Sequence, residues 1–285
     1  MNILVTGASG QLGKCIQGLA QEHSDLIFSF TDIPELDITD ENSVNSYFEE
    51  NSFDYCINCA AFTAVDLAES QKNKAYLINA EAVRILTEAC NVNNCVLIHI
   101  STDFVFDGEK KGPYNEKDIP NPINVYGKSK LQGEFYVQEI LKNYFIIRTS
   151  WVYSEHGKNF LKTMLRLGHE MEEINVVDDQ MGSPTYAADL AAFILFLITN
   201  KRQEYGLYHY SNEGTISWYD FAVKIFEVAE LNLKVNSICT AAYPTQAKRP
   251  KRSNLSKTKT INTFKITIPL WSDSLINCFS LLKTY

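Results

Sequence analysis

The sequence predicts an α/β protein in which a Rossmann-type, doubly wound parallel sheet carries a smaller, interleaved C-terminal substrate-binding lobe. Two observations predict this fold. Short apolar strands alternate with helical stretches through the first half of the chain, and a glycine-rich turn joins the first strand to the first helix. Alternation of this kind builds a parallel sheet with helices on both faces.

Apolar runs and helical periodicity define the elements of the first half. The sequence Val-Leu-Ile-His-Ile at 96–100 is nearly all apolar, which is typical of a strand buried on both faces. Strands are expected at 2–6, 26–30, 55–59, 95–101 and 144–149, and helices near 11–22, 40–50, 73–93 and 123–142.

Past residue 150 the pattern is less regular. Strand-like pieces at 174–177 and 206–211 flank a strongly apolar helix at 186–199, and a further helix is expected at 217–230. The predicted division is a dinucleotide-binding domain at 1–150, with 186–212 packing back on it, and a substrate-binding lobe at 151–185 and 213–285.

Composition narrows the class of protein. The 285 residues are 45% hydrophobic, enough for roughly two lobes of ~150 residues. The net charge of −8 argues against a nucleic-acid-binding protein, and no apolar run reaches the ~18 residues of a membrane span. The N-terminus shows no basic leader, and the seven scattered cysteines and five histidines show no ligand spacing. We therefore expect a cytoplasmic protein with reduced thiols, no metal site, and neither nucleic-acid nor membrane partners.

The glycine turn predicts a dinucleotide site. Gly7, Gly10 and Gly13 are spaced G-x-x-G-x-x-G between the first strand and the first helix. Gly7 allows the tight turn, Gly10 lets the backbone approach a pyrophosphate, and Gly13 lets the helix pack closely on the strand. The helix N-terminus would then face the pyrophosphate.

The choice of coenzyme stays open between NADH and NADPH. Asp32 follows the second strand, where a carboxylate accepts hydrogen bonds from a ribose and repels a 2′-phosphate, which favours NADH. Lys14 could reach a 2′-phosphate, although a lysine in the first turn of a helix is more often solvated.

Tyr126 and Lys130 are the strongest candidates for chemistry. They lie four residues apart and therefore on one face of a helix, where the ammonium can lower a phenol pKa that starts near ~10. Such a phenol exchanges a proton with a carbonyl near neutral pH. Taken alone, the pair is more often a solvated surface pair; the glycine turn favours the catalytic interpretation.

Two further segments are expected beside that helix, because strands of this fold end at the cofactor crevice. They are 58–66, with small residues suited to a nicotinamide ribose, and 101–108. The Thr102 hydroxyl could bond the same carbonyl oxygen as Tyr126, which would place two donors on a developing alkoxide. The alternative role for Thr102 is a helix cap.

These motifs resemble those of the extended short-chain dehydrogenase/reductases and, more narrowly, of the dTDP-4-dehydrorhamnose reductases. The resemblance covers nearly the whole chain. Its segments are the glycine turn, 60–69, 101–108, Tyr126-x-x-x-Lys130, 148–153, 159–160, 179–185, 206–209 and 249–250.

The resemblance implies a reaction and a set of site residues. Hydride would pass from NAD(P)H to the C4 ketone of dTDP-4-dehydro-L-rhamnose and give dTDP-L-rhamnose. Tyr126 would supply the proton, Lys130 would hold the ribose, and Thr102 would bind the substrate. The implied cofactor residues are Gly10, Gln11, Leu12, Asp32, Asp37, Ile38, Ala61, Phe62 and Thr63, and the implied sugar residues are Val65, Asp103 and Trp151. Arg249 is a candidate for the diphosphate, the alternative being a solvated basic cluster.

Two departures from the family pattern matter. Phe104 stands where many members carry tyrosine, and Cys15 and Ala188 stand where some members place acids of a metal-linked dimer contact. We therefore carry over no metal site and expect a monomer or a homodimer. Three alternatives remain: a reductase of another nucleotide-linked 4-keto deoxysugar, a dehydratase or epimerase (Phe104 takes the place of a second acid), and a non-catalytic regulatory subunit.

Overall fold

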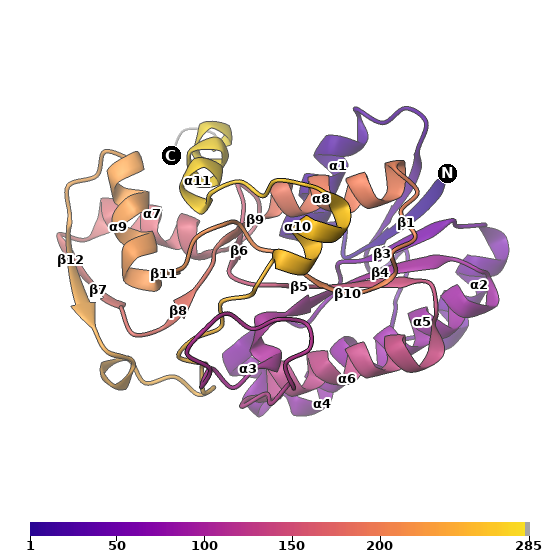
Figure 1. Ribbon diagram of the computed structural model, residues 1–285, viewed down its shortest axis with the longest axis horizontal. Helices are drawn as coiled ribbons and strands as arrows, with labels where there is room; N and C mark the ends of the chain where they lie inside the picture. Colours follow the sequence, from indigo (N-terminus) through magenta and orange to yellow (C-terminus); the bar gives the residue numbers. More distant parts are fainter. Residues whose placement is uncertain (283–285) are drawn as a thin grey trace.

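A parallel six-stranded sheet is the centre of the computed structural model, which describes residues 1–282 (Figure 1). Its strand order is β10-β5-β4-β3-β1-β2. The strands are β1 (Asn2–Thr6), β2 (Ile27–Thr31), β3 (Tyr55–Asn58), β4 (Val96–Thr102), β5 (Tyr144–Thr149) and β10 (Gly206–His209). Because β2 and β3 lie on opposite sides of β1, the strand order reverses there, and ligands of such sheets bind at that point.

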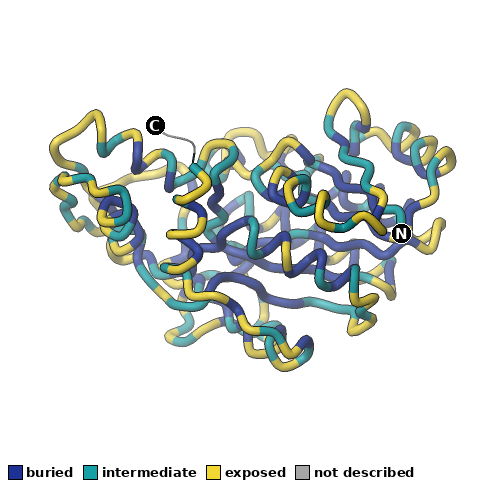
Figure 2. The backbone as a smooth tube through the Cα atoms, turned by 90° about the horizontal axis from the view of Figure 1, so that it is seen from above, coloured by how far each residue is buried: buried dark blue, intermediate teal, exposed yellow. Residues whose placement is uncertain are grey.

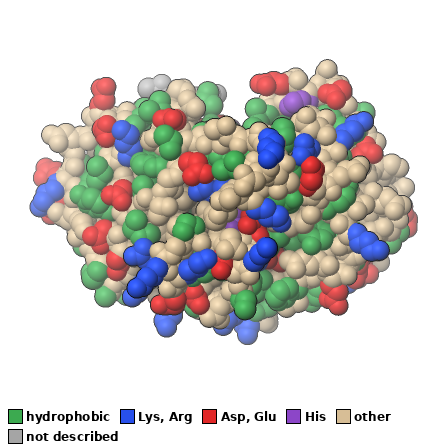
Figure 3. Space-filling view, in the orientation of Figure 1, with side chains coloured by type: hydrophobic (Ala, Val, Ile, Leu, Met, Phe, Trp, Pro, Cys, Tyr) green, Lys and Arg blue, Asp and Glu red, His purple; other side chains and the backbone are tan. Residues whose placement is uncertain are grey.

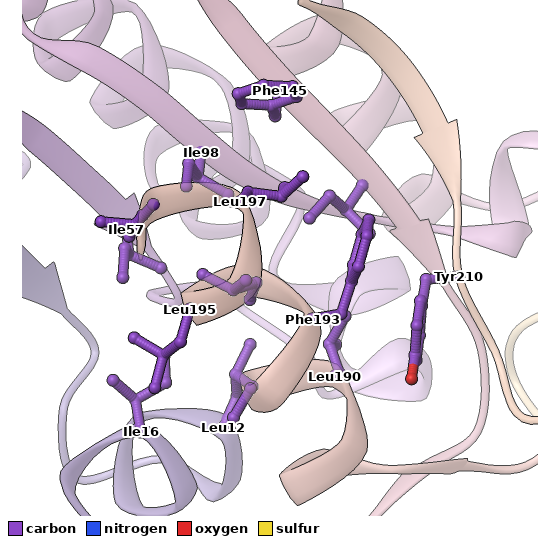
Figure 4. Close-up of a cluster of buried hydrophobic side chains, with 14 of the residues drawn as sticks. Leu12, Ile16, Ile57, Ile98, Phe145, Leu190, Phe193, Leu195, Leu197 and Tyr210 are labelled. Atoms are coloured by element: carbon purple, nitrogen blue, oxygen red, sulfur yellow. The ribbon is translucent and has the colours of Figure 1, made fainter. Parts of the chain in front are cut away.

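Helices cover both faces of the sheet, as Figure 1 shows. On one face lie α1 (Gln11–Ala20), α8 (Ala187–Thr199) and α10 (Thr258–Phe264); on the other lie α2 (Glu41–Glu50), α5 (Ala82–Val92) and α6 (Val125–Ile140). In the first of these cores Leu12 and Ile16 of α1 pack with Phe193 of α8 and with strand residues such as Ile98 (Figure 4). This double burial is why the central strands are apolar on both faces.

The lobe has its own hydrophobic core. It is built from α7 (Phe160–Glu170), α9 (Trp218–Val228) and α11 (Trp271–Leu281), with a parallel pair formed by β7 (Glu173–Val177) and β12 (Lys234–Ile238). Two short pairs lie outside the six-stranded sheet: β6 (Val152–Tyr153) with β9 (Thr185–Tyr186), and β8 (Met181–Gly182) with β11 (Ile216–Ser217). Dark blue, buried backbone runs through the sheet and reaches the lobe in Figure 2.

The predicted fold class is confirmed, and the expected strands of the sheet lie within one or two residues of those found. The expected helix at 73–93 is divided into α4 (Lys72–Tyr76), a π-helical turn at Leu77–Glu81 and α5. Sequence reasoning missed α3 (Val65–Ser70), α7, α10, α11 and β12.

One part of the predicted division is wrong. The predicted lobe includes the whole of 213–285, but Phe264 and Ile268 pack in the core of the sheet domain with Phe193 and Tyr208. A seven-residue helix is too short for its periodicity to reveal which core it joins. The other domain boundaries stay predictions.

The surface carries mixed charge. Lys and Arg side chains are interspersed with Asp and Glu over the face in Figure 3. Within residues 1–282 the longest apolar helices fall short of what a bilayer crossing needs.

Candidate active site

A cavity of about 1020 Å³ lies over the point where the strand order reverses and extends to the lobe. It brings together the glycine turn, the ends of β3 and β4, the start of α6 and the first residues of the lobe. Predicted site residues that line it are Gly7, Gly10, Gln11, Leu12, Asp32, Asp37, Ile38, Ala61, Thr63, Val65, Thr102, Asp103, Tyr126, Lys130, Trp151 and Arg249.

Gly13 and Phe62 are not among the residues that line the cavity, and the structure gives each of them other contacts. A Cβ at Gly13 would lie 2.6 Å from the Ala8 oxygen, so this glycine lets α1 pack on the turn. Both backbone groups of Phe62 bond the Asn79 amide, at 2.8 Å through its N–H and 3.1 Å through its C=O. Asn79, in the π-helical turn, is buried and also donates to the Ser129 hydroxyl at 3.0 Å. Sequence reasoning missed Asn79, because the predicted continuous helix gave its side chain no special position.

The glycine turn fits a dinucleotide. Gly7 has φ +67°, and a Cβ there would lie 2.6 Å from the Ala60 nitrogen, so only glycine lets the two loops meet. Gly10 precedes the first residue of α1 and lines the cavity, so the N–H groups at the start of that helix face it. Helix N-termini of this kind bind phosphate oxygens.

Asp32 lies at the same wall, and one carboxylate oxygen accepts the Ser9 N–H at 2.5 Å. This bond joins the end of β2 to the glycine turn and holds the carboxylate in place. Lys14 donates to Gln17 at 3.2 Å on the exposed side of α1. The preference between NADH and NADPH therefore stays open.

Tyr126 and Thr102 both line the cavity, and the Thr102 hydroxyl is close enough to influence the phenol. Asn124 caps α6 by accepting the Gly127 N–H at 2.7 Å, and this presents Tyr126 in the first turn. Burial raises the pKa of Tyr126 to about 12; the hydrogen bond with Thr102 opposes this rise, and Asp103 adds to it. The expectation of a depressed pKa is therefore wrong for the ligand-free protein, because desolvation of the phenolate is the largest influence on Tyr126 and raises its pKa.

Lys130 lies at the cavity floor with 2% of its surface exposed. Its side-chain nitrogen donates to the Ile100 carbonyl oxygen at 2.6 Å. Burial lowers the pKa of Lys130 to about 8, although Glu134 and Cys59 oppose this change. An isolated charge is costly to bury, so Lys130 titrates close to neutral pH.

Asp103 is a second unusual group beside Tyr126. One oxygen accepts the Thr102 hydroxyl at 3.1 Å, while the other is buried and has no hydrogen-bond partner among the described residues. Burial raises the pKa of Asp103 to about 7, and the neighbouring Ser253 and Thr102 hydroxyls limit the rise. A carboxyl with a free, buried oxygen in the wall of a cavity is suited to bonding a ligand hydroxyl.

Two stacked indoles form the wall of the cavity at the lobe. The rings of Trp151 and Trp218 are 3.6 Å apart and nearly parallel, and Trp151 has φ +48°. A Cβ at Gly182 would lie 2.6 Å from the Trp151 ring, so the indole is packed between Gly182 and Trp218. Sequence reasoning missed Trp218; its place directly after the helix cap Ser217 was the available signal.

Arg249 is held by an acid. It forms a two-pronged pair with Asp66, at 2.6 Å and 3.1 Å, and Asp66 also accepts the Ala247 N–H at 3.0 Å. This pairing lowers the pKa of Asp66. Arg249 therefore lines the cavity as one half of an ion pair, and the interpretation as part of a solvated basic cluster does not fit its position.

Cys15 of α1 is buried in the same core as Leu12 and Ile16. Its thiol lies within 4.8 Å of ligand atoms of Glu155 and His156, which are themselves paired at 3.3 Å. Burial, with Glu155 second, raises the pKa of Cys15 to about 12, so the free thiol stays neutral. The expected absence of a metal stays a prediction.

The chain matches the family model described as the RmlD substrate binding domain over residues 1–284. It is 42% identical to the dTDP-4-dehydrorhamnose reductase of Aggregatibacter actinomycetemcomitans over 96% of this chain and 97% of the relative, and 41% identical to that of Escherichia coli K12 over 95% and 94%.

Solved structures agree. The model superposes on a dTDP-4-dehydrorhamnose reductase of Clostridium acetobutylicum with a TM-score of 0.95 and 43% identity over all of both chains. It superposes on the Bacillus anthracis reductase in complex with NADP with a TM-score of 0.93 and 43% identity over 98% of both. A UDP-glucose 4-epimerase of Thermus thermophilus, 18% identical with a TM-score of 0.81 over 99% of this chain and all of that one, shares the fold. The chain belongs to the dTDP-4-dehydrorhamnose reductase family.

Proposed function

We propose that the protein reduces the C4 ketone of dTDP-4-dehydro-L-rhamnose to dTDP-L-rhamnose with NADH or NADPH. One observation carries the proposal. A single cavity is lined by the glycine turn, by Tyr126 and Thr102, and by the stacked rings of Trp151 and Trp218. A nicotinamide coenzyme supplies the hydride when it is bound at the glycine turn.

The chain's own residues would orient the ketone and move the proton. The ketone oxygen would accept hydrogen bonds from the Tyr126 and Thr102 hydroxyls, which stabilise negative charge as it develops there. Tyr126 would transfer its proton to that oxygen, and protonated Lys130 would stabilise the resulting phenolate. Tyr126 is protonated at neutral pH, because its raised pKa keeps the proton on the phenol.

Residues at the lobe side would select the nucleotide sugar. The apolar faces of Trp151 and Trp218 suit the C6 methyl group of a deoxysugar, and Asp103 suits a sugar hydroxyl. Arg249 would bind the diphosphate with its planar fork while Asp66 positions it. Val65 would line the same part of the cavity.

The test is oxidation of NADH and of NADPH on addition of enzymatically made dTDP-4-dehydro-L-rhamnose, with identification of the product. Tyr126→Phe is expected to lower kcat at least ~100-fold because it removes the proton donor, while coenzyme affinity changes little. A folded wild-type protein that binds coenzyme but leaves this sugar unreduced would contradict the proposal. Turnover of a different nucleotide-linked 4-keto sugar would then identify the substrate.

The remaining expectations belong to the same proposal. The protein would act in the cytoplasm as a monomer or homodimer on a nucleotide-sugar substrate. A purely regulatory role is less well supported, because such a role would not need Tyr126, Lys130 and Thr102 to meet in one cavity.

A further inference from the structure

A row of buried polar side chains crosses the centre of the sheet beneath the site. Thr6 of β1, Asn58 of β3 and His99 of β4 occupy neighbouring register positions, and at most 1% of each is exposed. The Thr6 hydroxyl donates to Asn58 Oδ1 at 2.9 Å, and Asn58 Nδ2 lies 3.2 Å from His99 Nδ1. Polar groups in such a core require a reason, because apolar side chains would pack there at lower cost.

The orientation of the Asn58 amide follows from a backbone contact. The Ala60 N–H points at Asn58 Oδ1 from 3.2 Å, and a backbone N–H can only donate. The oxygen must therefore face Ala60 and Thr6, and the amide NH₂ must face His99.

That orientation fixes the proton of the imidazole. Because Asn58 Nδ2 donates, His99 Nδ1 must accept, and a neutral imidazole then carries its proton on Nε2. Burial, with Lys130 second, lowers the pKa of His99 well below its usual value, so the ring is neutral.

The Nε2–H group faces Lys130. His99 Nε2 lies 3.5 Å from Lys130 Nζ, which also donates to the Ile100 oxygen. A neutral amine fits both neighbours, since it can donate to Ile100 and accept from His99. An ammonium has no lone pair, so it would place two donors opposite each other.

We propose that His99 is a positioning residue for Lys130. Asn58 fixes the His99 imidazole proton on Nε2, and this N–H group favours the neutral amine of Lys130 until coenzyme binds. The inference rests on the proposed function, in which Lys130 holds the coenzyme ribose. It explains why a histidine and an asparagine are buried side by side at the centre of the sheet.

Two other groups around Lys130 raise its pKa, whereas His99 favours the neutral amine. Glu134, one turn further along α6, and the Cys59 thiol after β3 both favour the ammonium. Glu134 is already paired with Arg148 at 2.6 Å and 2.8 Å, which leaves His99 as the neighbour with a donor facing the amine. The Tyr126 phenol, one turn before Lys130 on α6, has a pKa of about 12 and is therefore neutral over the pH range in which Lys130 titrates.

The experiment measures the affinity for NADPH and NADH as a function of pH, by coenzyme fluorescence and without substrate. An ammonium donates better to ribose hydroxyls and attracts the diphosphate, so wild-type affinity should fall as pH rises through about 8. His99→Asn keeps an acceptor for Asn58 but removes the N–H group at Lys130. Asn58→Asp keeps the imidazole but moves its proton to Nδ1, which turns Nε2 into an acceptor. In both variants, the pH at which half of the coenzyme affinity is lost should rise by about one unit.

Ile146→Val is the matched control, because Ile146 is the buried, apolar next member of the same register row on β5. Its pH dependence should equal that of the wild type. If folded His99→Asn and Asn58→Asp still bind coenzyme and the pH dependence of its affinity is unchanged, the inference about His99 is wrong while the proposed function stands. A shift in His99→Asn without one in Asn58→Asp would overturn the assigned imidazole proton. Failure of the wild type to bind either coenzyme at any pH would instead contradict the proposed function.

Discussion

At the scale of single residues, the site depends on groups whose burial changes their protonation. Tyr126 keeps its proton because desolvation dominates its pKa, and Lys130 titrates near neutral pH for the same reason. Sequence spacing identified both residues. It gave the wrong sign for the pKa of Tyr126 in the ligand-free protein, because spacing along a helix does not reveal how much water reaches the phenol.

Asp103 should link stability to pH. Its pKa is about 7 in the folded protein and near 3.8 in the unfolded chain, so the native state binds more protons between these values. The free energy of unfolding should therefore fall as pH rises from about 4 to about 7, by up to ~4 kcal/mol from this group alone. Urea unfolding of wild type and Asp103→Asn at pH 4.5 and 7.5 checks this.

The amide that Asp103→Asn introduces stays neutral, so this contribution to the free energy of unfolding does not change with pH. The variant should therefore become more stable relative to the wild type as pH rises. A difference between the two proteins that is the same at both pH values would show that the Asp103 carboxyl does not titrate in this window.

At the scale of elements, one glycine lets the helix that carries Tyr126 approach the loop that carries Thr102. A Cβ at Gly127 of α6 would lie 2.1 Å from the carbonyl oxygen of Phe104, which follows Asp103 in the short 3₁₀ turn after β4. Gly127→Ala should push Tyr126 away from Thr102, destabilise the protein by ~1–3 kcal/mol and lower kcat. Unfolding midpoints and steady-state rates measure both effects.

Gly18 of α1 provides the control for the loss of glycine itself. It is exposed, and a Cβ there would have no described atom within 4 Å. Gly18→Ala should stabilise the protein by roughly 0.5–1 kcal/mol, because alanine has the higher helix propensity, and should leave kcat unchanged. Equal effects of the two substitutions would refute the steric role of Gly127.

At the scale of the whole molecule, the sheet domain and the lobe meet through the first residue of α1. Gln11 accepts hydrogen bonds from Asn159 at 2.8 Å and from Ser154 at 3.0 Å, and it donates to the Val152 carbonyl oxygen at 3.4 Å. The residue directly after Gly10 of the glycine turn therefore also holds the loop that begins the lobe.

Gln11→Ala should loosen that loop without unfolding either core. We expect faster amide hydrogen exchange in residues 152–160 and a higher KM for the nucleotide sugar, while exchange in β3 and β4 stays slow. Lys162→Ala is the comparison variant, because the Lys162 ammonium contacts the same loop only through the Glu155 carbonyl oxygen, at 3.2 Å. Unchanged exchange at 152–160 in Gln11→Ala would show that other contacts hold the lobe.

The sequence by itself determined the parallel sheet, the glycine turn and the Tyr126, Lys130 and Thr102 set, because these depend on local periodicity and spacing. Only the tertiary structure decided what surrounds them. It placed Trp218 against Trp151, paired Arg249 with Asp66, bonded the Phe62 backbone to Asn79, and set His99 against Lys130. These contacts join residues far apart in the chain, and the pKa values depend on how completely the folded chain excludes water. The spacing of residues along one segment therefore predicts neither the long-range contacts nor the pKa values.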